Sequence, residues 1–168
     1  MKRHPHTLAM TLFVIFCLVF IVAGYASAEE YEALKGVKSV KAIFDFRAGS
    51  PKSAVLQLKL INDTFKDGSL TAITKNPDFV VAFSGPSVKL ISKNHEGFSP
   101  EDQELLDEIA STVAAMAKSG IRLEICLFAA KIFNVDPGSV LPEIQQVGNG
   151  WISLIGYQTK SYSLVPAY

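Results

Sequence analysis

Residues 79–87, with the sequence FVVAFSGPS, indicate the fold class most directly. The first five residues are an uninterrupted apolar run, which is typical of a strand buried on both faces of a parallel sheet. The Ser-Gly-Pro-Ser segment that follows predicts a turn that leads into a helix. A strand followed directly by a helix is the repeating unit of α/β proteins.

The same alternation recurs on both sides of this stretch. Apolar, β-branched and aromatic runs predict further strands, and apolar residues at helical spacing predict helices between them. The predicted fold class is α/β, a three-layer sandwich with a mostly parallel sheet of four to five strands. The predicted strands are 37–46, 79–83, 121–126, 143–147 and a short fifth at 162–165, and the predicted helices are 51–65, 88–91, 100–119, 127–133 and 151–160.

The N-terminus has the three-part layout of a secretory signal peptide. A basic start precedes an apolar stretch at 12–22, and Ala26-Ser27-Ala28 forms a small-residue cleavage site. We predict a signal peptide at residues 1–28, cleaved after Ala28. The alternative is an uncleaved anchor, because the mostly apolar stretch at 8–25 gives about 18 residues, near the lower limit for a membrane-spanning helix.

The chain that remains after cleavage, residues 29–168, is long enough for one domain with a hydrophobic core and too short for two. Loss of Lys2 and Arg3 lowers the 16 Lys and Arg residues to 14, against 16 Asp and Glu residues, so the net charge becomes −2. This charge gives no electrostatic case for nucleic-acid binding. The exported protein is expected to be periplasmic or secreted, without a membrane attachment.

Cys126 is the only cysteine that remains after signal cleavage, because Cys17 lies in the signal peptide. An intramolecular disulfide is then excluded. A free thiol is unusual in an oxidising compartment, where cysteines are commonly paired in disulfides. His95 is likewise the only remaining histidine, which removes the usual Cys and His ligands of a zinc or copper site. We expect no metal and no cofactor.

The predicted strand at 121–126 places Cys126 where a strand passes into a helix. Ligands bind at the carboxyl ends of strands in open α/β sheets, and a helix N-terminus favours a thiolate. The apolar residues 127–130 oppose this effect, because they would remove the thiolate from water. Alternation places Arg122 and Glu124 on the strand face of Cys126, where they either modulate the thiol or pair with each other and with solvent. Two interpretations of Cys126 stay open, a reactive thiol and an inert buried side chain.

Three other segments are candidate site elements. Ser84, Gly85 and Ser87 lie in a turn whose N–H groups could hold a small anion, although an ordinary strand-to-helix turn explains the same residues. Asp45, near the end of the first strand, is a candidate cleft residue. The segment 148–153, GNGWIS, resembles a dinucleotide-binding fingerprint, but serine replaces the third glycine. A tight turn that caps the last helix explains this segment better.

Several of these segments together resemble the DsrE/DsrF-like proteins, and the chain is similar to an exported, single-domain member. The resemblance rests on residues 80–90 (VVAFSGPSVKL), 120–126 (GIRLEIC), Leu141-Pro142 and the turn and helix at 148–157. It implies a flavodoxin-like (Rossmann-like) fold and assembly into trimers or hexamers. For several members of the family it also implies a cysteine that carries sulfur as a persulfide, and Cys126 falls at that position.

The residues and the resemblance lead to one main hypothesis and one alternative. The main hypothesis is a periplasmic sulfur carrier, at most a persulfide-type sulfur transferase, in which Cys126 accepts sulfane sulfur and passes it to a partner protein. The alternative is an oligomeric binding or assembly module with a buried, inert cysteine, because Leu127-Phe128-Ala129 stand where exported members often have small polar residues. Five further residues would form the substrate-binding part of the site: Asp45, Ser84, Gly85, Ser87 and Arg122.

Overall fold

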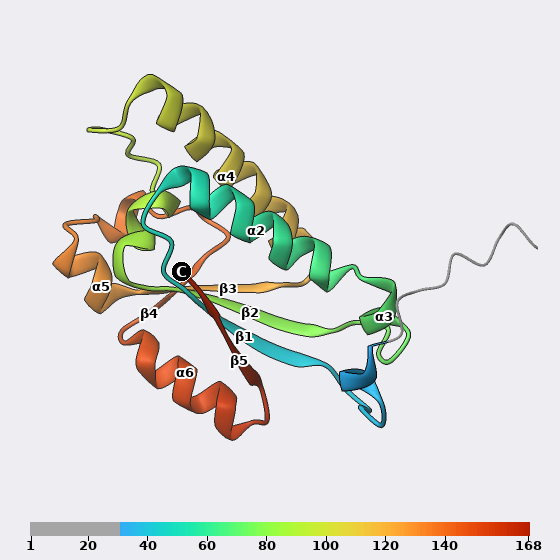
Figure 1. Cartoon of the computed structure of the whole chain (residues 1–168). Coiled ribbons are helices and arrows are strands. Elements are labelled where there is room, and N and C mark those ends of the chain that lie inside the picture. The colour runs from blue at the N-terminus through green and yellow to red at the C-terminus, as the bar shows by residue number, and fades with distance from the viewer. Residues whose placement is uncertain (1–30) are drawn as a thin grey trace, which may run out of the picture. The chain divides into compact units, whose positions relative to one another are not determined.

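Five strands form the central sheet, in the order β4-β3-β2-β1-β5 (Figure 1). The computed structural model describes residues 31–168, so the predicted signal peptide at 1–28 lies outside the described residues. Every neighbouring pair of strands is parallel, which confirms the predicted parallel sheet. The strands are β1 (Lys41–Phe46), β2 (Asp78–Phe83), β3 (Arg122–Cys126), β4 (Gln145–Val147) and β5 (Ser163–Ala167).

Helices cover both faces of this sheet and give it three layers. α2 (Pro51–Phe65) and α4 (Pro100–Lys118) lie on one face, and α6 (Gly150–Thr159) lies on the other (Figure 1). This is the predicted three-layer α/β sandwich of the flavodoxin-like type. The shorter helical segments are η1 (Glu32–Leu34), α3 (Gly68–Thr71), η2 (Gly85–Ile91), α5 (Leu127–Ile132) and η3 (Pro137–Ser139).

The two long helices begin where the sequence supplies caps. Ser50 Oγ accepts a hydrogen bond from the Ser53 amide at 3.3 Å, and Ser99 Oγ accepts one from the Asp102 amide at 3.1 Å. Each cap precedes a proline at the start of the helix, where no amide hydrogen is needed. The buried residues of both helices recur at helical spacing, and they are Pro51, Ala54, Leu58, Ile61, Leu106, Ile109, Val113 and Met116.

Most of the hydrophobic core lies between the sheet and the layer of α2 and α4. Phe44 and Phe79 belong to this core, with ring centroids 5.1 Å apart. The buried carboxylates of Asp45 and Glu124 lie on the opposite face, because side chains alternate along each strand. The apolar cluster on that face is much smaller and consists of Ile43, Val80, Ala82 and Tyr162, with Leu154 and Tyr157 packed against it.

The two predicted boundaries that differ most from the structure are the start of the first strand and the start of the helix at 88–91. The first strand begins at Lys41, later than predicted, because β2 begins only at Asp78 and residues 37–40 have no strand to pair with. The helix predicted at 88–91 is a 3-10 segment that begins at Gly85. The φ of +58° at Gly85 lets the chain turn directly out of β2, so the helical segment begins earlier than the apolar spacing indicates.

Residues Gly36–Tyr168 form one compact unit, and η1 belongs to the segment before it. Within the described residues, no helix combines the length and the apolar character needed to cross a membrane. The stretch at 8–25 that would form the alternative anchor lies outside those residues. Cleavage after Ala28 therefore stays a prediction.

The connections that follow β3 and β4 lie on opposite faces of the sheet (Figure 1). From β1 to β4 each strand is added on the same side of the previous one, and the apolar residues of these connections join the core of α2 and α4. The return from β4 to β5 passes over the opposite face through α6 (Figure 1). The segments after β3 and β4 thus diverge, an arrangement that opens a ligand-binding crevice at strand carboxyl ends in α/β sheets.

Candidate functional site

Cys126 lies at this point of divergence. It is the last residue of β3 and the N-cap of α5, and its Sγ accepts a hydrogen bond from the Ala129 amide at 3.4 Å. The Phe128 amide donates to the Gly148 carbonyl oxygen at 3.1 Å and ties the end of β3 to the segment after β4. Cys126 is 6% exposed. The structure thus places the thiol at the strand-to-helix junction that the sequence predicts.

A pocket of about 310 Å³ lies beside Cys126. Phe128, Ile132 and Trp151 are each more than half exposed, so they form the rim of the pocket. The thiol therefore borders a pocket whose wall is mostly apolar. The full set of lining residues is Arg47, Ser84, Gly85, Cys126, Phe128, Ala129, Ile132, Phe133, Asn149 and Trp151.

A small polar network forms one side of the pocket. The Arg47 Nε–H donates to both carboxylate oxygens of Asp45, at 3.0 Å each, and the Ser84 hydroxyl donates to Asp45 Oδ1 at 3.1 Å. Asp45 is buried, so its carboxylate fixes the positions of Arg47 and Ser84. Gly85 completes this side of the pocket, in a left-handed conformation that residues with a Cβ rarely adopt.

The first turn of α6 contacts Cys126 directly. The Asn149 side chain caps this helix by accepting a hydrogen bond from the Trp151 amide at 3.0 Å. At Gly150, an added Cβ would lie 3.0 Å from the Cβ of Cys126 and 3.5 Å from its Sγ. The missing side chain at Gly150 therefore makes room for the cysteine. The segment 148–153 is the tight turn and helix cap that the sequence predicts.

The structure brings together most of the predicted site residues. Cys126, Ser84 and Gly85 line the pocket, and Asp45 is hydrogen-bonded to two of its lining residues. Ser87 is buried, and its hydroxyl bonds to carbonyl oxygens at the ends of β1 and β2 at 2.9 and 2.8 Å. Ser87 therefore holds the turn in place and is not among the residues that line the pocket.

The lining residues that sequence reasoning missed include Arg47, Phe128 and Trp151. Arg47 is the first residue after β1, so the rule that ligands bind at strand carboxyl ends could have found it. Phe128 and Trp151 lie in the first turns of α5 and α6 and resemble ordinary core residues of a helix. The sequence alone does not show that these helices leave both side chains exposed.

Residues 16–166 match the DsrE/DsrF-like family, which is nearly the whole chain. The chain belongs to the DsrE/DsrF-like family. The family resemblance seen in separate segments of the sequence is thereby confirmed over nearly the whole domain.

Relatives of this DsrE/DsrF-like protein include an uncharacterized protein of Aquifex aeolicus (strain VF5), 25% identical over 128 residues. The match covers 76% of this chain and 56% of that protein, so the chain spans little more than half of the relative. Among solved structures, the protein of unknown function MTH1491 from Methanobacterium thermoautotrophicum has a TM-score of 0.60 at 12% identity, covering 76% of this chain and 99% of that one. The ychN protein from E. coli has a TM-score of 0.54 at 13% identity, covering 77% and 100%. These structural similarities show a shared fold.

Arg122 lies at the opposite end of β3 from Cys126. Its guanidinium donates to Asp78 Oδ1 and to the Tyr162 hydroxyl at 2.5 Å each. Burial would raise the pKa of Asp78, but hydrogen bonds from Tyr162 and Arg122 outweigh it and hold this pKa below its usual value. Four residues of extended strand span about 13 Å. The structure therefore does not bring Arg122 to the thiol, although both side chains share one face of β3.

Glu124 lies between Arg122 and Cys126 on this face. It is 5% exposed, and its Oε1 accepts a hydrogen bond from the Tyr157 hydroxyl at 2.7 Å. Its Oε2 is buried and has no hydrogen-bond partner among the described residues. Burial and the bond to Glu124 raise the pKa of Tyr157 from 10.0 to about 12. The Tyr157 hydroxyl therefore stays protonated at neutral pH and donates to the buried side chain of Glu124.

The raised pKa of Tyr157 predicts a loss of stability at alkaline pH. A phenol whose pKa is higher in the folded chain than in the unfolded chain stabilises the fold. This contribution is complete at a pH below the unfolded pKa of 10.0 and is lost as the pH rises through the folded pKa of about 12. We expect the free energy of unfolding, measured with urea, to fall more steeply above pH 10.0 in the wild type than in Tyr157→Phe. Equal slopes in the two proteins would contradict this role of Tyr157.

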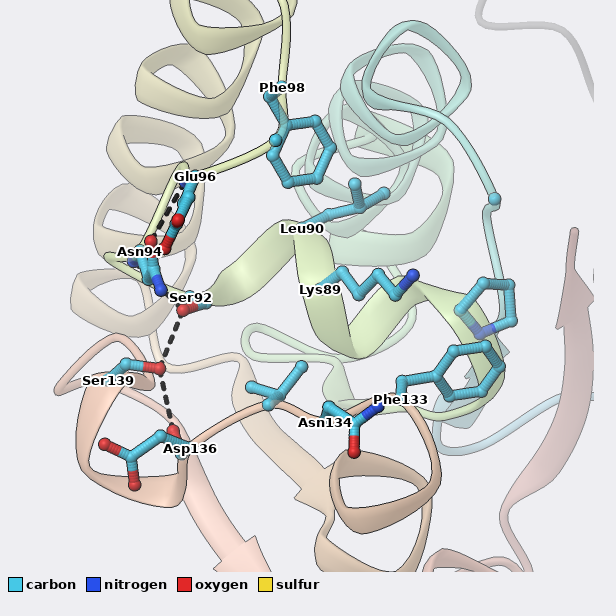
Figure 2. Close-up of a pocket in the computed structure, with 14 residues that line it drawn as sticks. Lys89, Leu90, Ser92, Asn94, Glu96, Phe98, Phe133, Asn134, Asp136 and Ser139 are labelled. Atoms are coloured by element: carbon cyan, nitrogen blue, oxygen red, sulfur yellow. Dashed lines mark hydrogen bonds between the residues drawn. The ribbon is translucent and has the colours of Figure 1, made fainter.

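A second pocket of about 480 Å³ lies between η2, the loop after it and the segment after α5. Figure 2 shows Lys89 extending from η2 toward Phe133, whose ring centroid lies 5.5 Å from Nζ. Several polar groups that line this pocket are hydrogen-bonded to one another. The Ser92 and Ser139 hydroxyls are 2.7 Å apart, and the Ser139 hydroxyl also donates to the Asp136 carbonyl oxygen (Figure 2). No cysteine lines this pocket. The pocket beside Cys126 is therefore the better candidate site.

Proposed function

We propose that this protein carries sulfane sulfur as a persulfide on Cys126 and passes it to a partner protein. The observation that carries the proposal is the position of the thiol, which borders a pocket at the carboxyl end of β3. Membership of the DsrE/DsrF-like family supports a role in sulfur relay. The Ala129 amide also supports it, because an N–H donor stabilises negative charge on Sγ and the thiolate is the reacting form.

The chemistry of loading and unloading is the same exchange run in two directions. In loading, the Cys126 thiolate attacks the outer sulfur of a donor persulfide, R–S–SH. A new sulfur–sulfur bond forms, the sulfur–sulfur bond of the donor breaks, and the electron pair leaves with R–S⁻. In unloading, an acceptor thiolate attacks the outer sulfur of the Cys126 persulfide. Neither step needs an oxidant or a reductant, so the role is that of a carrier or, at most, a sulfur transferase.

The single thiol suits a carrier better than a redox enzyme. Cys126 is the one free cysteine among the described residues. No second thiol in this part of the chain can attack the persulfide, release sulfide and leave a disulfide behind. A dithiol redox enzyme needs such a resolving cysteine. The proposal includes no cofactor.

The location and assembly of the protein are part of the proposal. The predicted signal peptide at 1–28 supports a periplasmic or secreted protein without a membrane attachment after cleavage. A trimer or hexamer is supported by the exposed apolar side chains of Ile152 and Ile155 on α6, which a second copy would cover. Donor and acceptor of the sulfur are then partners of this assembly.

Native alkylation tests whether the thiol can be reached. We expect iodoacetamide to modify Cys126 in the folded protein, because the reagent is smaller than the pocket of about 310 Å³ that the thiol borders. Unfolded wild type and folded Cys126→Ser are the controls, and the modification is read by mass. A thiol that reacts only in the unfolded protein would rule out the relay.

A binding or assembly module is the second candidate function. The low exposure of Cys126 and the exposed Ile152 and Ile155 favour it. In that case the thiol is an inert core side chain, and the useful surface is the outer face of α6. The alkylation experiment separates the two candidates, because only the carrier requires an accessible thiol.

A further inference from the structure

The rim of the Cys126 pocket is built from large apolar side chains. Phe128 and Ile132 come from α5 and Trp151 comes from α6, and all three are exposed. These side chains expose apolar surface to solvent next to the buried thiol of Cys126. A ligand in the pocket would remove part of that surface from water, which is favourable in proportion to the apolar area buried.

The one charged side chain that lines the pocket is neutralised. Arg47 donates to both carboxylate oxygens of Asp45 at 3.0 Å, and the Asp45 side chain is 8% exposed. A ligand beside Arg47 therefore meets an ion pair without net charge. A multiply charged anionic donor would lose its water of hydration there without gaining an uncompensated cation.

We infer that this pocket receives the organic group of a low-molecular-weight persulfide, and that this group is uncharged and either aromatic or branched aliphatic. The inference rests on the proposed function and names the class of its sulfur donor. The pocket volume of about 310 Å³ lies at the lower end of the range for small-molecule sites. The apolar rim holds the organic group, and the sulfur atoms of the donor face Cys126.

The transfer from such a donor balances without a further reagent. The Cys126 thiolate attacks the outer sulfur of R–S–SH, and the sulfur–sulfur bond of the donor breaks as the new one forms. The electron pair leaves with R–S⁻, and the proton stays on the transferred sulfur. The apolar R–S⁻ then takes up a proton from water and leaves the pocket.

The test compares the rates at which three donors load Cys126, followed by intact mass. The donors are benzyl persulfide, glutathione persulfide and inorganic polysulfide. Each rate is divided by the rate of the same donor with N-acetylcysteine, which removes differences in intrinsic reactivity. We expect the normalised rate of benzyl persulfide to exceed that of glutathione persulfide by at least about tenfold, the size of effect that partial burial of one aromatic ring gives.

Three variants test whether the preference for benzyl persulfide arises from the pocket beside Cys126. Trp151→Ala and Phe128→Ala each remove a rim side chain and should lose most of the preference for benzyl persulfide. Leu56→Ala shortens an exposed apolar side chain on α2, outside the pocket, and should keep it. All three side chains are exposed, so the fold is expected to survive each change.

The possible outcomes separate this inference from the proposed function. Equal normalised rates, or a faster glutathione persulfide, would overturn the apolar donor and leave the carrier standing. A preference for benzyl persulfide that survives in both pocket variants would overturn the assignment to this pocket. Failure of all three donors to load Cys126 would overturn the carrier and the inference together.

Discussion

Replacement of Tyr157 by phenylalanine is expected to lower the free energy of unfolding by about 3 kcal/mol. The variant keeps the ring, which packs against the Arg122 guanidinium, and removes only the hydroxyl that donates to Glu124 Oε1 at 2.7 Å. Glu124 is 5% exposed and its other carboxylate oxygen has no partner among the described residues. The change therefore leaves both oxygens of a buried side chain without a donor, which costs more than the loss of a solvent-exposed hydrogen bond.

Tyr162→Phe is the matched control for this prediction. The Tyr162 hydroxyl donates to Asp78, whose side chain is 42% exposed, so water can replace the lost donor. We expect a loss of about 1 kcal/mol or less for this variant. Urea denaturation of both variants, with m-values compared to the wild type, gives the two free energies. Equal losses would contradict the role of Tyr157 as the hydrogen-bond donor to the buried side chain of Glu124.

Gly150→Ala is expected to destabilise the protein by about 2 kcal/mol and to slow the native alkylation of Cys126. The new Cβ would lie 3.0 Å from the Cβ of Cys126, closer than side chains normally pack, so the thiol or the first turn of α6 must move. Alanine stabilises a helix by up to about 1 kcal/mol relative to glycine, and the expected loss is what remains after this gain. Urea denaturation and iodoacetamide kinetics measure the two effects.

Gly156→Ala, in the same helix, is the control for this change. An added Cβ at Gly156 meets no atom within 4 Å. Only the helix preference of alanine remains, so we expect a gain of about 0.5–1 kcal/mol and an unchanged alkylation rate. Stabilisation of both variants, with the same alkylation rate in both, would contradict the close contact between α6 and Cys126.

The layers of this fold are predictable from sequence because they depend on local signals. The apolar run at 79–83 indicates a strand buried on both faces, and it is the central strand β2. Ser50-Pro51 and Ser99-Pro100 give both the caps and the first turns of the long helices. The start of the first strand is not predictable in this way, because it depends on where the neighbouring strand begins.

The candidate site is predictable only in part. Asp45, Ser84 and Cys126 each lie at or just after the end of a strand, and parallel strands bring their carboxyl ends to one edge of the sheet. Alternation correctly places Arg122 on the face of Cys126, but four residues of extended strand separate the two by about 13 Å, which is too far for Arg122 to contact the thiol. Arg122 bonds instead to Asp78, a residue 44 positions away in the chain.

The carrier proposal is tested most directly by the intact mass of the wild type and of Cys126→Ser after exposure to polysulfide, each with and without a reductant. A persulfide on Cys126 predicts that the wild type alone gains the mass of whole sulfur atoms and that the reductant removes the gain. No gain on the wild type, or an equal gain on Cys126→Ser, would contradict a sulfur carrier that works through this thiol.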